Sequence, residues 1–134
     1  MLQLTKLISN KGISLLLLII IGTAIPVLSL INLSGMPTFQ IKSADKLYHL
    51  IAYASLSFIF ALHYHNHVKR KISSVSYLGI FLLAVIFGII IEVLQDTLTS
   101  YRTFDYFDIL ANACGALLGL VIISILLRIL KFKK

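Results

Sequence analysis

Long apolar runs separated by short polar segments make up most of this chain. The four runs lie at about residues 13–33, 47–64, 77–98 and 108–130. Each is close to the roughly 20 residues that an α-helix needs to cross the hydrocarbon core of a bilayer. The pattern therefore predicts four transmembrane helices.

The composition agrees with a membrane protein. Hydrophobic residues make up 59% of the chain and charged residues 13%, which excludes an ordinary soluble protein. The first run follows two lysines, as a secretory signal would, but it is long for a signal and lacks a convincing cleavage site, so we expect it to remain as a helix. The loops are too short for a second domain, and residues 1–134 are predicted to form one all-α bundle.

Lysines and arginines gather on one side of the predicted topology. Nine of the twelve lie before the first helix, between the second and third, or in the last turn of the fourth helix and beyond it. The positive-inside rule then places both termini and the middle loop in the cytoplasm. The net charge of +7 reflects this topology and an attraction to anionic lipid, and does not indicate binding to nucleic acid.

The acidic residues fall toward the opposite, outward-facing side. They occupy three short segments at the outer ends of the second, third and fourth helices, as Asp45, Glu92, Asp96, Asp105 and Asp108. Lys42, Lys46 and Arg102 are the basic residues of that side. Acids outnumber bases there, so the outer face is expected to attract cations.

In the first segment Asp45, His49 and Tyr53 are spaced four apart and share one helical stripe. A purely structural interpretation makes Asp45 a partner of the helix dipole and the two rings interfacial residues. His49 also keeps register with an acid that can orient or protonate it, which favours a role in a site.

In the second segment Glu92, Gln95 and Asp96 share one face of the third helix. Glu92 lies about six residues, or ~9 Å of helical rise, inside the predicted outer end. A charged acid within the membrane is costly, so Glu92 should face polar partners rather than lipid. It either joins neighbouring helices or belongs to a functional site, and Gly88 one turn earlier allows a close helix approach under both interpretations.

In the third segment Asp105 is typical of a helix cap, followed by Asp108 in the first turn and Asn112 on the same face. Gly115 and Gly119 continue along that helix as a small-residue step for tight helix packing. Arg102 can pair with one or more of the acids and so hold the outer loop down.

The three segments place polar residues at a similar depth in the membrane. His49, Glu92 and Asn112 each lie one to two turns inside the outer end of their helices. We expect an outward-facing polar pocket, with Asp96 among the residues of its rim. The candidate pocket residues are Asp45, His49, Tyr53, Glu92, Gln95, Arg102, Asp108 and Asn112, of which Asp45, Arg102 and Asp108 are also placed at the rim.

A group of histidines, including His63 and His67 four apart, lies at the inner end of the second helix. That spacing can hold zinc, but Lys69, Arg70 and Lys71 follow directly and repel a cation. We predict no metal site and no cofactor.

The ordered polar set resembles the VanZ-like family of small bacterial membrane proteins. The resemblance is carried by Asp45-Lys46-x-x-His49-x-x-x-Tyr53, by Glu92-x-x-Gln95, and by Arg102, Asp105, Asp108, Asn112, Gly115 and Gly119. It implies a multi-pass protein of the bacterial cytoplasmic membrane with a connection to the cell envelope. The family takes its name from a glycopeptide-resistance protein, but the resemblance supplies no mechanism.

Three functions compete. The first is binding or modulation of a lipid-linked or amphiphilic envelope ligand by the outward pocket. The second is hydrolysis of a lipid phosphate, with Glu92 or Asp108 as general base, His49 as acid or metal-ligand partner, and Arg102 holding the phosphate. The third is proton-coupled transport through Glu92, for which the chain could assemble as a homo-oligomer. Whether the protein is an enzyme stays open at this stage.

Overall fold

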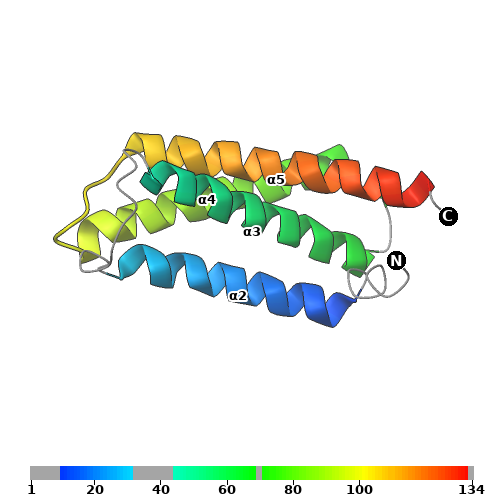
Figure 1. The fold of residues 1–134 in the computed structure, drawn as a ribbon, viewed down its shortest axis with the longest axis horizontal. Coiled ribbons are helices and arrows are strands. Elements are labelled where there is room, and N and C mark those ends of the chain that lie inside the picture. Colours follow the sequence, from blue (N-terminus) through cyan, green and yellow to red (C-terminus); the bar gives the residue numbers. More distant parts are fainter. Residues whose placement is uncertain (1–9, 32–43, 69–70, 133–134) are drawn as a thin grey trace.

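The computed structural model describes residues 10–31, 44–68 and 71–132, and side chains as far as residue 130. It is an all-α bundle (Figure 1) of helices α2 (Lys11–Leu30), α3 (Ala44–Val68), α4 (Ser74–Leu98) and α5 (Tyr106–Phe132). Each helix is long and apolar enough to cross a membrane. The prediction of four such helices in an all-α fold is confirmed.

The helices extend beyond several of the predicted boundaries. Polar caps outside the apolar runs set two of the starts. The Asn10 side chain accepts hydrogen bonds from the backbone N–H groups of the first turn of α2, and Ser73 does the same for α4. The predicted end of the first helix at residue 33 lies outside the described residues.

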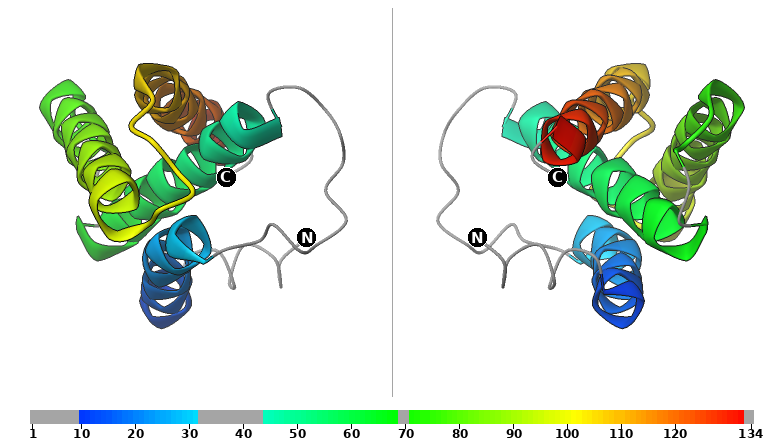
Figure 2. Two further views of the ribbon diagram at one scale, coloured as in Figure 1. Left: turned by 90° about the vertical axis from the view of Figure 1, so that its left-hand side faces the viewer. Right: turned by 90° about the vertical axis from the view of Figure 1, so that its right-hand side faces the viewer.

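Helix α3 lies in the middle of the bundle, between α2, α4 and α5 (Figure 2). Its most extensive contact is with α5. Gly115 and Gly119 lie at this contact, where an added Cβ would overlap the carbonyl oxygens of Leu50 and Ala54. The two backbones are therefore close enough that any larger residue would push the helices apart.

Helix α2 packs more loosely and is held near its two ends. Of its residues, Ser14 and Ile25 are buried. The Ser14 hydroxyl lies 3.2 Å from His63 Nδ1 of α3. At the other end, the Gln95 amide nitrogen donates to the carbonyl oxygen of Ser29 over 3.0 Å. Hydrogen bonds near the ends thus add to the modest apolar packing along this helix.

The outward faces of the helices are apolar. Large side chains such as Leu16, Leu28, Leu83 and Leu118 are exposed on the bundle surface. Such faces fit contact with lipid tails and not with water. By contrast, all five acidic residues lie at one end of the bundle, where α3 and α5 begin and α4 ends.

Candidate functional site

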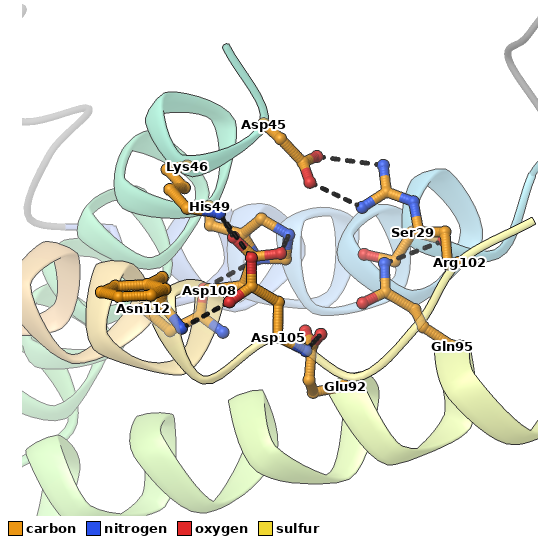
Figure 3. A network of polar contacts seen from close by, with 11 residues as sticks. Ser29, Asp45, Lys46, His49, Glu92, Gln95, Arg102, Asp105, Asp108 and Asn112 are labelled. Carbon is orange, nitrogen blue, oxygen red and sulfur yellow. Dashed lines mark hydrogen bonds and ion pairs between the residues drawn. The ribbon is translucent and has the colours of Figure 1, made fainter. Parts of the chain in front are cut away.

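The acidic end of the bundle holds a set of neighbouring polar side chains from α3, α4, α5 and the segment between α4 and α5 (Figure 3). We call this set the polar cluster. It consists of Asp45, Lys46, His49, Tyr53, Glu92, Gln95, Arg102, Asp105, Asp108 and Asn112. All eight pocket candidates named from the sequence belong to it.

His49 is buried between α3 and α5. Its Nδ1 lies 3.0 Å from the Asn112 side-chain oxygen, and its Nε2 lies 3.8 Å from a carboxylate oxygen of Asp108. An amide oxygen only accepts, so this contact suits the tautomer of His49 in which Nδ1 is the donor. Both ring nitrogens therefore face polar groups of α5, which fixes the orientation of the ring.

Lys46 joins the two aspartates at the start of α5. Its Nζ lies 2.6 Å from Asp105 and 3.0 Å from Asp108. The rim position expected for Asp108 is wrong, since this residue is only 3% exposed. Lys46 lies one turn before His49 and thus reaches the acids on the same side of α3. Sequence reasoning left Lys46 out of the pocket candidates, because the need for a nearby cation follows from the burial of Asp108, which the sequence alone does not give.

Asp105 begins α5 as a cap. Its carboxylate accepts a hydrogen bond of 2.8 Å from the backbone N–H of Phe107, and its own backbone N–H donates to Glu92 over 2.9 Å. The Lys46 ammonium, followed by the Phe107 N–H, lowers the pKa of the Asp105 carboxyl. Asp105 is therefore a charged link between α3 and the first turn of α5.

Acidic side chains fasten the segment between α4 and α5. Both guanidinium NH2 nitrogens of Arg102 contact the Asp45 carboxylate, at 3.0 and 3.1 Å. Asp96 is exposed and accepts a hydrogen bond of 3.1 Å from the backbone N–H of Phe104. With the Glu92 contact to the backbone of Asp105, these bonds hold the segment over the polar cluster.

Four buried polar atoms of the cluster have no hydrogen-bond partner among the described residues. They are the Tyr53 hydroxyl, Glu92 Oε2, Gln95 Oε1 and Asn112 Nδ2. Their residues, from α3, α4 and α5, are at most 2% exposed. Burying a donor or acceptor without a partner is unfavourable, so such a set is unusual in a packed interior.

Gly88 makes room for two of these residues. A Cβ added there would lie 2.9 Å from Asn112 Nδ2 and 3.2 Å from a ring carbon of Tyr53. The sequence indicated that Gly88 permits a close helix approach, but not that it lies against the polar cluster. Any side chain at position 88 would press on these two residues.

Two cavities of the described part lie away from the polar cluster. One, of about 320 Å³, is lined by apolar residues of α2, α3 and α4. The other, of about 600 Å³, lies between the start of α4 and the second half of α5. Neither coincides with the expected polar pocket, because no residue of the polar cluster lines either of them.

Asp45, His49 and Asp108 bring one ligand atom each to within 4.8 Å of one another. This set has donors that a metal ion can use, which the sequence-based expectation of no metal site did not foresee. Arg102 and Lys46 already bind the two carboxylates. A metal would have to compete with both cations for them.

No curated protein and no solved structure matches the chain significantly. A family model, described as VanZ/LLP1, matches residues 4–128. The match takes in α2, α3 and α4 completely, α5 as far as Arg128, and every residue of the polar cluster. With nearly its whole length and its entire polar cluster inside that match, this chain belongs to the VanZ/LLP1 family.

Proposed function

We propose that this protein binds a lipid-linked or amphiphilic molecule of the bacterial cell envelope through its polar cluster. The observation that carries the proposal is the set of four buried polar atoms without a partner in the described structure. Leaving such an atom unpaired costs about 1–3 kcal/mol. A polar group that enters the cluster would supply the missing partners and recover that free energy.

The four atoms indicate the chemistry of the ligand. Glu92 Oε2 and Gln95 Oε1 accept hydrogen bonds, whereas the Asn112 amide nitrogen donates and the Tyr53 hydroxyl does both. Hydroxyl, amide or ammonium groups of a head group satisfy such a mixture. Acids outnumber bases in the described part of this end, so a neutral or cationic head group is favoured over an anionic one.

The charge distribution suggests the side of entry. The positive-inside rule places the acidic end outward in the bacterial cytoplasmic membrane. The ligand would then come from the outer leaflet, where lipid-linked precursors of the envelope and amphiphilic antibiotics are found. Family membership makes susceptibility to glycopeptides one of the phenotypes to measure in cells.

The test compares Glu92→Gln and Tyr53→Phe with Asp96→Asn in lipid nanodiscs. Two probes are titrated, a cationic lipoglycopeptide and a polyprenyl-pyrophosphate-linked disaccharide pentapeptide, and the anionic linkage of the second makes it the less favoured of the two. We expect the first two variants to bind at least one probe about tenfold more weakly, since each removes one hydrogen-bonding or charged group. Asp96→Asn removes a charge from the same helix at an exposed position, and should change affinity less than about twofold.

Stability provides the second measurement. The Tyr53 hydroxyl has no partner in the described structure, so Tyr53→Phe should not lower the free energy of unfolding. Loss of about 1 kcal/mol or more would show that the hydroxyl has a structural partner, which would remove the argument for a ligand. Unchanged affinity in both Tyr53→Phe and Glu92→Gln would contradict the proposal directly.

A hydrolase acting on a lipid phosphate is the second candidate. It is favoured by the position of His49 between Asn112 and Asp108, with Asp45 close enough to share a metal. The surplus of acids makes an anionic substrate unfavourable unless a cation binds with it, so this function ranks second. Phosphate release from a polyprenyl phosphate, measured with divalent metal or chelator, should be abolished in His49→Ala. Absence of turnover in the unmodified protein would exclude it for that substrate.

A further inference from the structure

The larger cavity lies in the half of the bundle that holds no acidic residue. It is an open groove of about 600 Å³ between the start of α4 and the second half of α5. Leu117, Val121 and Ile125 form its wall on α5, and each is roughly half exposed, at 56%, 46% and 53%. These residues face away from the bundle core, so the groove opens toward lipid.

The length of the groove matches one leaflet. Along α5 it runs from Leu117 to Arg128, which is about 16 Å of helical rise. The hydrocarbon region of one leaflet is about 15 Å thick, half of the full core. An extended acyl chain lying against α5 would therefore reach from the bilayer midplane to Arg128.

Polar groups of the groove gather toward one end. Ser124 and Arg128 are one turn apart on α5, and Tyr77 lies in the first turn of α4. Arg128 is exposed and has no ion-pair partner among the described residues, whose carboxylates all lie at the opposite end of the bundle. A guanidinium group there is free to bind a phosphate with two parallel hydrogen bonds.

We propose that this groove binds one anionic phospholipid, with an acyl chain along α5 and its phosphate on Arg128. The predicted topology puts this end at the cytoplasmic leaflet, where anionic lipid attracts basic side chains. The length of the apolar wall and the charge at its end both suit such a lipid. The site is separate from the polar cluster and does not depend on the function proposed for it.

The experiment uses native mass spectrometry of the full chain released from nanodiscs. The nanodiscs hold equal amounts of phosphatidylglycerol and phosphatidylcholine with identical acyl chains. We expect the unmodified protein to retain one phosphatidylglycerol in preference to phosphatidylcholine, and Arg128→Gln to retain about tenfold less of it. Lys71→Gln, which removes an exposed charge from the same end but not from the groove, should behave as the unmodified protein.

A second variant tests the groove itself. Val121→Phe places a larger side chain in the groove and should reduce retention of phosphatidylglycerol. Circular dichroism should show the same helix content as in the unmodified protein. Equal retention of the two lipids by the unmodified protein would overturn the proposal, as would normal retention in Arg128→Gln. A lipid-free dimer that Val121→Phe converts to monomer would also overturn it, because the occupant would then be a second copy of the chain.

Discussion

At the scale of residues, the polar cluster contains two kinds of side chain. Asp45, Arg102, Lys46 and Asp105 form ion pairs that join α3 to the segment before α5 and to its first turn. Glu92, in contrast, uses one carboxylate oxygen on a backbone N–H and leaves the other without a partner in the described structure. The ion pairs hold this end of the bundle together, whereas the carboxylate oxygen of Glu92 without a partner is part of the argument for a ligand.

Asp105 offers a test of the ion pairs by pH. Asp105→Asn keeps a good helix cap but removes the charge that Lys46 binds. The pKa of this carboxyl is lowered in the folded protein. Its stabilising contribution is therefore complete above the ordinary pKa of about 3.9 and is lost as the pH falls through the lowered value.

We accordingly expect Asp105→Asn to unfold at a lower temperature than the unmodified protein at pH 7, with the difference shrinking at about pH 3. Thermal unfolding followed by circular dichroism at both pH values measures this. If the two proteins differ in unfolding temperature by the same amount at both pH values, the charge of Asp105 does not stabilise the fold.

At the scale of elements, the contact between α3 and α5 determines which residues meet in the polar cluster. Gly115 and Gly119 bring the two backbones together one to two turns below His49 and Asn112. The register of one helix against the other follows from this close contact. A change at the glycines should therefore affect stability and the His49 hydrogen bond together.

Gly115→Ala tests the contact. The added methyl group would overlap the carbonyl oxygen of Leu50, and overpacking of this kind costs about 1–3 kcal/mol. Gly79→Ala is the matched control, because an added Cβ there has nothing within 4 Å and Ala is the better helix former by up to about 1 kcal/mol. Denaturant titration in detergent should show Gly115→Ala less stable than the unmodified protein and Gly79→Ala at least as stable.

The sequence predicted the helices better than the contacts between their side chains. Run length is a local property, so the sequence predicts all four helices, but several of their ends lie two to four residues beyond the apolar runs, as at the polar caps Asn10 and Ser73 and at both ends of α3. The hydrogen bond between His49 and Asn112 depends on the register of α3 against α5, which no local pattern contains. Lys46 was left out for the same reason, since its partners are 59 and 62 residues away.

At the scale of the whole molecule, charge is strongly divided between the two ends. The acids lie at one end, and Lys11, Lys71 and Arg128 lie at the other. The positive-inside rule makes this division a prediction of orientation, with both termini in the cytoplasm. The proposed ligand site and the proposed lipid groove would then serve opposite leaflets.

Labelling of single cysteines tests that orientation. Cys114, the one cysteine of the chain, is exposed on α5 and is first replaced by serine. A membrane-impermeant maleimide should label Thr103→Cys in intact spheroplasts, but Ser74→Cys only after lysis. Both positions are exposed, Ser74 at the start of α4 and Thr103 in the segment that follows the end of α4. The reverse pattern would place the polar cluster on the cytoplasmic side.

The attachment of α2 bears on how this protein can diverge in sequence. Gln95 and Tyr101 donate hydrogen bonds to the backbone carbonyl oxygens of Ser29 and Leu30, and every residue type carries such an oxygen. Side chains in that part of α2 can therefore be exchanged for others of similar hydrophobicity without removing these two bonds. Ser14 differs, because its own hydroxyl meets His63. Related proteins are thus expected to keep hydrogen-bond donors at the positions of Gln95 and Tyr101, while the sequence of α2 varies more and stays apolar.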